Sequence, residues 1–463
     1  MSNSKTAVVV LAAGLGTRMK SGLPKVLHPL AGRSMIAHLV DTVSELQPER
    51  MVVVVGEDMA AVQAAVAPHP TVVQSPRLGT GHAVMAARPL LEGFAGTVLV
   101  VYGDTPLITA MTLERMLAVR RHAPHPSVVV LGFRPADPGA YGRLMVDAEG
   151  GLEAIVEAKD AAAEQLALGL CNSGVMAVDG ANLFRLLDRV GNDNAKGEYY
   201  LTDIVALARS EGLPCGYVEG DVSELVGVNS RADLAAAEAI LQDRLRAVAM
   251  AEGATLIDPR TVYFSWDTVL GQDVTVGPSV MFGPGVKVGD RVEILGFCHI
   301  EGATIAHGAR IGPFARLRPG AAVATDAHIG NFVEIKNASI EMGAKVNHLS
   351  YIGDARIGAG ANVGAGTITC NYDGFFKSHT DVGAGAFIGS NTCLVAPVRI
   401  GDGAIVGASS AIAKDVPADA LAVTRGPHLV RDGWAKRFRD RRGAEKLAAT
   451  SSAPGKKTGS GKG

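Results

Sequence analysis

The sequence contains few cysteines and no long apolar run. The five cysteines are Cys171, Cys215, Cys298, Cys370 and Cys393. Because their number is odd and no two form a C-x-x-C pair, neither a disulfide framework nor a zinc ribbon is indicated. No stretch reaches the roughly 18 apolar residues of a membrane-spanning helix. The short N-terminal apolar run passes directly into a glycine loop without a cleavage site. We therefore expect a cytoplasmic protein that neither crosses a membrane nor is secreted.

Neither sign of charge is in excess, and aromatic residues are scarce. The 44 basic residues oppose 46 acidic ones, for a net charge of -2, which excludes a general attraction to nucleic acid or to an anionic membrane. Aromatic residues form 5% of the chain and thin out in its second half, where glycine becomes frequent. Because single cores stop growing at about 250 to 300 residues, a chain of 463 is expected to form two or more domains.

The first half alternates short β-branched runs with helical segments, which is typical of an α/β domain with a mostly parallel sheet. We predict strands over residues 7–11, 51–55, 98–101, 127–133 and 171–178. Residues 231–253 are rich in strong helix formers and end at a glycine, which predicts a linker helix. The predicted division is therefore a first domain over 1–230, this helix, a second domain over 254–440 and a disordered basic tail over 441–463.

A glycine loop with two well-spaced cations follows the first predicted strand. Residues 8–25 read V-V-V-L-A-A-G-L-G-T-R-M-K-S-G-L-P-K. Gly14 and Gly16 permit close backbone approach to phosphate oxygens, while Arg18 and Lys25 supply positive charge. The loop lacks the G-K-[ST] of a Walker A motif and the third glycine of a dinucleotide fingerprint. A βα turn that merely favours glycine would not need both cations, so we predict a triphosphate site.

The second half repeats every six residues. A period of six fits neither an α-helix nor simple strand alternation. It suits a triangular parallel coil in which each side points one aliphatic residue inward and turns a corner beside it, often at glycine. The pattern predicts a left-handed parallel β-helix whose inward residues are Leu270, Val276, Phe282, Val288, Ile294, Ile300, Ile311, Leu317, Val323, Ile329, Ile335, Val346, Ile352, Ile357, Val363, Val382, Ile388, Leu394, Ile400, Val406 and Ile412.

The repeat is broken between Val363 and Val382, which are nineteen rather than eighteen positions apart. Loops extruded from a rigid scaffold are common places for function. Four polar residues of this segment fall outside the aliphatic pattern: Asn371, Tyr372, Asp373 and Lys377. Lys336 and Tyr351 lie beside inward positions and should therefore project outward, where they can reach a groove between neighbouring prisms.

Several motifs resemble those of known enzymes. The glycine loop is similar, residue for residue, to the L-x-x-G-x-G-T-R-M…P-K signature of sugar-1-phosphate nucleotidyltransferases. Three further segments resemble segments that distinguish one family from its relatives. They are V-E-A-K-D-A over 156–161, H-L-S-Y-I-G-D over 348–354 and N-Y-D-G-F-F-K over 371–377. From about residue 7 to 440 the chain resembles the bacterial bifunctional N-acetylglucosamine-1-phosphate uridylyltransferases and glucosamine-1-phosphate N-acetyltransferases. The resemblance implies a Rossmann-like mixed sheet followed by the β-helix.

The resemblance also implies the reactions and partners. Glucosamine-1-phosphate would be acetylated by acetyl-CoA, and UMP would then pass from UTP to the product, giving UDP-N-acetylglucosamine and pyrophosphate for cell-envelope precursors. Mg²⁺ is the implied cofactor, and the partners are these small molecules, with no nucleic acid and no membrane. Related hexapeptide enzymes are homotrimers, because a groove between two prisms is concave whereas one face of a prism is not.

For uridylyl transfer, the resemblance implies that Arg18 and Lys25 act on the triphosphate and that Asp104 and Asn229 hold Mg²⁺, which prefers oxygen ligands. The sugar phosphate would attack the α-phosphorus of UTP in line, without a general base, because this nucleophile is already anionic. The residues implied to bind UTP or UDP-N-acetylglucosamine are Leu11, Ala13, Gly14, Gln74, Gly79, Thr80, Gly142, Glu157, Asn172 and Asn229.

For acetyl transfer, the resemblance implies His348 as the base, because amide formation needs a neutral amine and imidazole titrates in the right range. A lone histidine is more often structural, and its N-H-L-S-Y context favours the catalytic role. Residues implied to bind glucosamine-1-phosphate are Arg318, Lys336, Tyr351, Asn362, Asn371, Tyr372 and Lys377. Residues implied to bind acetyl-CoA are Ala365, Ser390, Ala408 and Arg425.

Three alternative functions remain open at this point. A monofunctional nucleotidyltransferase with a regulatory or scaffolding β-helix explains the first half but not His348. A γ-type carbonic anhydrase shares the β-helix and holds zinc between subunits, but the spacings of His299, His307, His328 and His379 fit no ligand set. A non-catalytic scaffold would not need the cations and carboxylate of the first domain.

Overall fold

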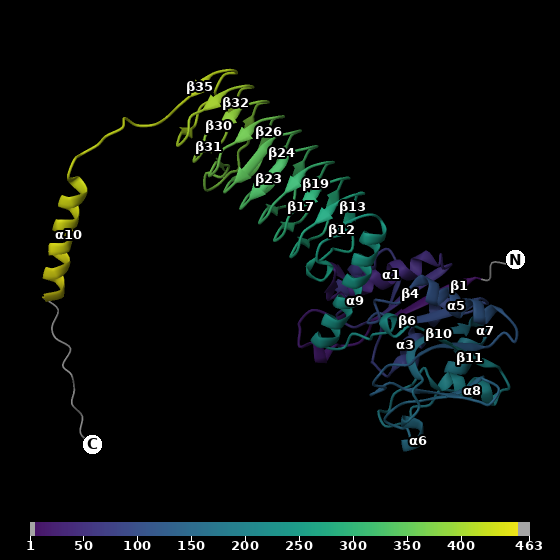
Figure 1. Cartoon of the computed structure of the whole chain (residues 1–463). Coiled ribbons are helices and arrows are strands. Elements are labelled where there is room, and N and C mark those ends of the chain that lie inside the picture. Colours follow the sequence, from purple (N-terminus) through teal and green to yellow (C-terminus); the bar gives the residue numbers. More distant parts are fainter. Residues whose placement is uncertain (1–4, 452–463) are drawn as a thin grey trace, which may run out of the picture.

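The computed structural model describes residues 5–451, and the positions beyond them lie outside it. Figure 1 shows an α/β domain, a long helix α9 (Arg231–Ala251) beside it, and a prism of short strands that extends away from both. The chain then leaves the prism and ends in a helix, α10 (Trp434–Ser451), which stands apart from the prism in this view.

The first domain is built on a mixed sheet of nine strands. These strands are β1 (Thr6–Leu11), β4 (Arg50–Gly56), β5 (Thr71–Gln74), β6 (Thr97–Tyr102), β7 (Val128–Phe133), β8 (Arg143–Val146), β9 (Leu152–Val156), β10 (Cys171–Asp179) and β11 (Cys215–Glu219). The main path runs β11-β7-β10-β6-β1-β4-β5. Along it only β10 is antiparallel to its neighbours. All five strands predicted from the sequence are present.

Helices cover both faces of this sheet. Alternate residues of β1 point to opposite faces, so that Val8 joins one hydrophobic core and Val9 the other. The helices are α1 (Met35–Glu45), α2 (Ala60–Val66), α3 (Thr80–Ala86), α4 (Arg88–Leu91), α5 (Ala110–Arg121), α6 (Ala163–Leu166), α7 (Gly180–Leu187) and α8 (Asp203–Ser210). Side chains of α1 and α5 pack in the core with Val8, and those of α3, α7 and α8 in the core with Val9. A mostly parallel sheet buried on both faces has this arrangement.

Helix α9 joins the two domains. Ser230 accepts a hydrogen bond from the backbone N–H of Asp233 and forms a capping box with it, which fixes where the helix begins. Along its length, Ala237 packs against the first domain. One turn and a half later, the Gln242 side chain donates to the Phe264 carbonyl oxygen at 2.7 Å and accepts from the Phe264 N–H at 2.8 Å. The helix therefore packs against both domains.

The prism has three faces, each a column of short parallel strands. One face holds β12 (Thr255–Leu256), β14 (Thr275–Val276), β17 (Glu293–Ile294), β20 (Arg310–Ile311), β23 (His328–Asn331), β25 (Lys345–His348), β27 (Asn362–Val363), β30 (Phe387–Ile388), β33 (Ile405–Val406) and β35 (Leu421–Ala422). The second holds β13 (Val269–Leu270), β16 (Lys287–Val288), β19 (Ala303–Ile305), β22 (Ala321–Val323), β29 (Thr380–Val382) and β32 (Val398–Ile400). The third holds β15 (Met281–Phe282), β18 (His299–Ile300), β21 (Arg316–Leu317), β28 (Ile368–Cys370), β31 (Cys393–Val395) and β34 (Ala411–Ile412).

Two longer strands, β24 (Glu334–Ile340) and β26 (Tyr351–Ile357), turn the corner between the second and third faces. Glu334 is paired with Arg316 on one face, and Ala338 is paired with Ala321 on the other. The parallel coils and their six-residue repeat are consistent with the predicted left-handed β-helix.

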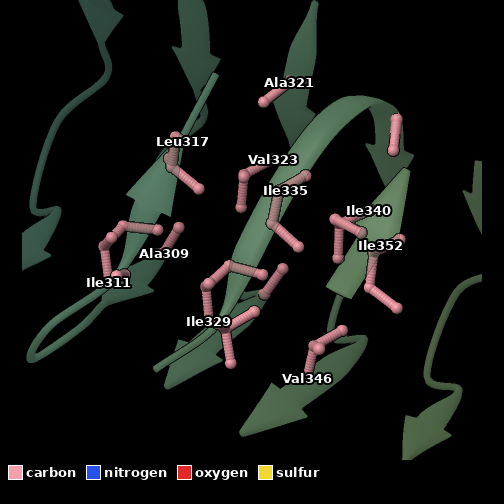
Figure 2. Close-up of a cluster of buried hydrophobic side chains, with 14 of the residues drawn as sticks. Ala309, Ile311, Leu317, Ala321, Val323, Ile329, Ile335, Ile340, Val346 and Ile352 are labelled. Atoms are coloured by element: carbon pink, nitrogen blue, oxygen red, sulfur yellow. The ribbon is translucent and has the colours of Figure 1, made fainter. Parts of the chain in front are cut away.

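The interior of the prism is formed by the predicted aliphatic residues. All are buried except Leu270 at the first coil, which is half-buried. Figure 2 shows that residues such as Leu317, Ile335 and Ile352 lie in a row on successive coils. A second, smaller residue two positions earlier also points inward, as Ala309 does before Ile311. The prediction of one inward residue per side was therefore incomplete.

Most of the glycines that directly follow an inward residue have a different cause from the one expected, and Gly312, with φ 93°, is an exception. The sequence indicated that they turn the corners, yet Gly358 has no positive φ, and the left-handed corner position is taken by Gly360, with φ 67°. A Cβ added at Gly358 would lie 2.5 Å from the backbone nitrogen of Ala384 on the next coil. This glycine is therefore required by the close approach of successive coils.

One coil is longer than the others. Lys345 is paired with Asn362, seventeen positions later, but Asn362 is paired with Phe387, twenty-five positions later. The additional residues form the loop 371–379 between β28 and β29. The predicted interruption is present, and it is larger than the single extra residue that the hexad count suggested, because Val382 lies two sides of the prism beyond Val363 and not three.

The predicted disordered tail over 441–463 was wrong for its first part. Residues up to Ser451 belong to helix α10, whose charged side chains pair along the helix, including Lys436 with Asp440 at 2.8 Å and Arg442 with Glu445 at 2.8 Å. Pairs at this spacing and strong helix formers favour a helix. Residues 452–463 lie outside the described part of the chain.

Candidate active sites

The glycine loop follows β1, and the side chain of Lys25 packs against it. Gly16 adopts φ 62° and a Cβ added there would lie only 2.6 Å from the Cβ of Lys25. Glycine is therefore required twice over, by the left-handed backbone and by the packing of this lysine. The short helices η1 (Thr17–Met19) and η2 (Lys25–Leu27) complete the loop and return the lysine towards the sheet.

Lys25, Asp104 and Asn229 meet at the carboxyl end of the parallel strands. The Nζ atom of Lys25 lies 2.5 Å from Oδ2 of Asp104 and 3.0 Å from Oδ1 of Asn229. Asp104 follows β6, and its carbonyl oxygen accepts a hydrogen bond from the N–H of Val228 at 2.8 Å. This backbone bond holds the segment of Asn229 beside β6. Ligands of open α/β sheets bind at this edge.

The oxygens around the Lys25 ammonium fit a divalent cation. A carboxylate oxygen and an amide oxygen converge on one positive charge, and Mg²⁺ prefers such ligands, completed by substrate phosphates and water. Within residues that the structure describes, no group of three or more His, Cys, Asp or Glu side chains is placed to hold a metal ion. Asp104 and Asn229 could therefore supply two ligands, with the remainder coming from substrate and solvent.

Most of the residues implied to bind the nucleotide line one cavity. They are Leu11, Ala13, Gly14, Lys25, Gln74, Gly79, Thr80 and Asp104. Gln74 is buried, and its Nε2 donates to the Gly79 carbonyl oxygen at 2.9 Å. Thr80 accepts from the backbone N–H of Leu201 at 3.0 Å, so the wall formed by the T-G-H segment is tied to a distant part of the domain.

The three residues implied to bind the acetylated sugar lie close to one another. The N–H of Asn172 donates to the Gly142 carbonyl oxygen at 2.8 Å. Val156, directly before Glu157, has its carbonyl oxygen 3.4 Å from a Cβ added at Gly142. Burial raises the pKa of Glu157, and a hydrogen bond from Thr202 at 3.4 Å opposes this only in part. Glu157 lines a recess beside the nucleotide cavity together with Asp160 and Tyr200.

Two placements differ from the sequence prediction. Arg18 is exposed and does not line the nucleotide cavity, whereas Arg77, which the sequence reasoning missed, does. The Nε of Arg77 donates to the carbonyl oxygen of Ala13 at 2.7 Å, which places a second cation beside the glycine loop. The signal that could have found it is its position three residues after Gln74, at the end of a strand of the same sheet. Tyr102 also lines the cavity.

In the prism, His348 lies at the end of β25 and is exposed. Its Nδ1 is 2.7 Å from Oδ1 of Asn331, the last residue of the neighbouring strand β23. Its carbonyl oxygen accepts from the N–H of Gly366 at 3.3 Å and from the Ser350 hydroxyl at 2.8 Å. The imidazole is therefore held on the surface, where a substrate can reach it.

Three cations gather on the outside of neighbouring coils. The close approach of Lys377, through a side-chain hydrogen bond and charge repulsion, lowers the pKa of Lys336, and the charge of Arg318 lowers it further. Arg318 donates to Oε1 of Glu334 at 2.8 Å. Lys377 comes from the loop 371–379, so the extruded loop brings a cation back to the face of β24. Such a cluster attracts an anion such as a sugar phosphate.

An aspartate ties this loop to the prism. The carboxylate of Asp354 accepts from the side-chain amides of Asn337 at 2.6 Å and of Asn371 at 2.5 Å. Burial opposes ionisation, but these hydrogen bonds and the charges of Lys377 and Lys336 outweigh it and lower the pKa of Asp354. The sequence reasoning did not identify Asp354, although it lies in the H-L-S-Y-I-G-D motif. Tyr372, further along the loop, is exposed and donates to the Gly374 carbonyl oxygen at 2.6 Å.

The residues implied to bind acetyl-CoA follow the same edge of the prism as His348. Ala365 accepts from the N–H of Asn391 at 2.7 Å, and Ser390 accepts from the N–H of Ser409 at 2.7 Å. Ala365, Ser390 and Ala408 therefore occupy corresponding positions on successive coils. Arg425 lies beyond them, with its guanidinium 3.5 Å from a Cβ added at Gly407. Asn362 is paired with Lys345 and Phe387 on the face of β25.

Among the described helices none is long and apolar enough to cross a membrane.

Profiles of known protein families match a segment in each half of the chain. The profile of the MobA-like NTP transferase domain matches residues 8–166, and that of the bacterial transferase hexapeptide, with six repeats, matches residues 267–302.

Curated relatives match almost the whole chain. "Bifunctional protein GlmU" of Paramagnetospirillum magneticum is 66% identical over 446 residues, which cover 96% of this chain and 99% of that protein. The protein of the same name from Rhodospirillum rubrum is 68% identical over 436 residues, covering 94% of this chain and 98% of the relative. That of Ruegeria sp. is 54% identical, with coverage of 96% and 99%. The chain therefore belongs to the family of bifunctional GlmU proteins.

Proposed function

We propose that this chain converts glucosamine-1-phosphate, acetyl-CoA and UTP into UDP-N-acetylglucosamine, CoA and pyrophosphate in two steps at two sites. Residues 1–230 carry the uridylyltransferase and residues 254–440 the acetyltransferase, with 231–253 as the linker between them. The observation that carries the proposal is that each half has its own constellation: Lys25 with Asp104 and Asn229 in the sheet domain, and His348 with the cation cluster on the prism.

In the first step, the neutral amine of glucosamine-1-phosphate attacks the thioester carbonyl carbon of acetyl-CoA. The unprotonated Nε2 of His348 takes the proton that the amine loses, and collapse of the tetrahedral intermediate expels the CoA thiolate, which regains a proton. Lys336, Lys377 and Arg318 hold the phosphate. The amino sugar is oriented by Asn371, Tyr351 and Asn362. Acetyl-CoA binds along the edge of the prism that carries Ala365, Ser390 and Ala408, and Arg425 also contacts it.

In the second step, a phosphate oxygen of N-acetylglucosamine-1-phosphate attacks the α-phosphorus of UTP, and pyrophosphate leaves in line. Lys25 and Arg77 neutralise phosphate charge, and we assign Arg18 the same role when the triphosphate reaches the glycine loop. Gln74, Gly79 and Thr80 frame the nucleotide, while Gly142, Glu157 and Asn172 bind the sugar. Mg²⁺, when bound by Asp104 and Asn229, supplies further neutralisation of the triphosphate.

We further propose that the working form is a homotrimer in the cytoplasm. His348 and the cation cluster lie on the convex outside of a prism, where a second prism would be needed to form a groove that excludes water. All five cysteines are free thiols, which suits a reducing compartment.

The proposal is tested by incubating the purified chain with glucosamine-1-phosphate, acetyl-CoA, UTP and Mg²⁺ and following UDP-N-acetylglucosamine, CoA and pyrophosphate. Formation of the complete product supports both activities. Pyrophosphate release only with pre-acetylated sugar, without CoA release, would instead indicate a monofunctional nucleotidyltransferase with a structural β-helix. Sedimentation at the assay concentration tests the trimer, and an active monomer would contradict the shared groove.

A further inference from the structure

We infer that Asn331 is a positioning residue of the acetyl-transfer reaction: its side-chain oxygen fixes the tautomer of His348 without adding a charge beside the imidazole. The inference rests on the proposed acetyltransferase function, in which His348 accepts a proton. It assigns a role to a residue that does not itself reach the substrate.

The two side chains are brought together by the register of the prism. Asn331 and His348 are paired residues on the neighbouring strands β23 and β25, seventeen positions apart, which is one coil. Both backbones are fixed, because the Asn331 carbonyl oxygen accepts from the N–H of Leu349 at 3.0 Å, and that of His348 accepts from Gly366 and Ser350. The 2.7 Å contact between Oδ1 and Nδ1 therefore joins two groups on a rigid frame.

An amide oxygen can only accept a hydrogen bond, so the shared proton belongs to Nδ1 of the imidazole. The other ring nitrogen, Nε2, then carries the lone pair and is the atom able to accept a proton. Within the described residues, the imidazole of His348 makes one hydrogen bond, the one between Nδ1 and Asn331, and Nε2 has no protein partner. The geometry thus presents the basic nitrogen to the outside of the prism.

The neutral partner also matters for the working pH. A carboxylate in this place would favour the imidazolium and raise its pKa, whereas an amide orients the ring without this effect. Of the strands packed against β25, β23 carries one titratable side chain, that of His328, and β27 carries none. In the described part of the chain His348 takes part in no ion pair. Asn331 therefore orients the base without placing a negative charge beside it.

Two substitutions separate these effects. Asn331→Leu removes the acceptor and keeps the branching of the side chain, and we expect kcat/KM for acetyl transfer to fall about tenfold, the size of one lost hydrogen bond. Asn331→Asp keeps the acceptor and adds a charge. We expect the acid limb of its kcat/KM–pH profile to move up by about one unit, with activity restored at alkaline pH. Uridylyl transfer onto supplied N-acetylglucosamine-1-phosphate, measured as pyrophosphate release, serves as the control and stays unchanged in both variants.

The pH profile decides the outcome, because a merely structural role would lower activity without moving the acid limb. An Asn331→Asp profile that coincides with that of the unsubstituted chain, or full acetyl transfer in Asn331→Leu, would overturn the inference. Ring ¹⁵N chemical shifts of His348 test the tautomer independently of activity: we expect Nδ1 protonated, and a change of tautomer in Asn331→Leu. If the unsubstituted chain itself released no CoA, the proposed function would fail, while these shifts would still decide whether Asn331 sets the tautomer.

Discussion

The Nζ atom of Lys25 lies 2.5 Å from Oδ2 of Asp104, although 79 positions separate the two residues in the chain. Lys25 belongs to the loop after β1 and Asp104 to the turn after the adjacent strand β6, so the parallel pairing of these strands makes the contact. Both side chains are largely buried, with 11% and 22% of their side-chain surfaces exposed. A charge pair this well sheltered is screened by solvent less than a surface pair.

Replacing Asp104 by asparagine tests the uridylyltransferase site. The substitution keeps the volume but removes the negative charge that faces Lys25 and that would hold the cation. We expect pyrophosphate release to fall by at least about a hundredfold, as expected when one electrostatic contact to the reacting group is lost. CoA release should stay near that of the unsubstituted chain. Loss of both activities in folded protein would argue against independent sites.

Replacing His348 by alanine tests the acetyltransferase site. Removal of a general base should lower CoA release by about 10² to 10⁴-fold, while uridylyl transfer onto pre-acetylated substrate continues. His328 offers a control on the same face, one strand away, and its replacement by alanine should leave acetyl transfer almost unchanged. Equal losses in the two variants would contradict the assignment of the base.

Gly16→Ala tests whether the glycine loop is held in one shape. The change places a Cβ in a left-handed backbone position and within 2.6 Å of Lys25, so we expect a loss of about 1 to 3 kcal/mol in the free energy of unfolding of this domain. Gly22→Ala is the matched control, because a Cβ there meets nothing within 4 Å and its φ is not positive. Denaturant titrations in which both variants unfold alike would show that the loop is free to adjust.

Glu157 should make the stability of the first domain depend on pH. Because burial raises its folded pKa above the ordinary value of 4.5, the folded state binds more protons than the unfolded state above that pH, and stability falls as the pH rises from 4.5 through the folded pKa. Glu157→Gln removes this loss. The variant should therefore melt at a higher temperature than the unsubstituted chain at pH 7, and the difference should shrink as the pH falls towards 4.5. A constant difference across this range would contradict the raised pKa.

The interior of the prism gives a stability prediction with an internal control. Ile388 is fully buried, while Ile405 on the paired strand β33 points outward and is 50% exposed. Ile388→Ala should cost about 2 to 5 kcal/mol through lost burial and the cavity left behind, and Ile405→Ala much less. Thermal or denaturant unfolding of the two variants measures the contrast. Similar losses would mean that the outer face is buried in the assembled protein.

The sequence alone determined the features that follow from local chemistry and from periodicity. The six-residue repeat identified the inward residues of the prism, because each coil repeats the same environment and buries an apolar side chain at the same position. The glycine loop and its lysine were recognisable for a similar reason, since contact with phosphate needs small residues and positive charge in a short stretch.

Only the tertiary structure decided which distant residues meet. Strand order in the first domain determines that Lys25 contacts Asp104 and that Arg77 lines the cavity instead of Arg18. The length of each coil, which is seventeen, eighteen or twenty-five residues, determines that Asn331 is paired with His348. A slip of one residue in that register would point every side chain of a strand to the opposite face. Local sequence preference is too weak to specify such a register, which is fixed by the packing of the whole domain.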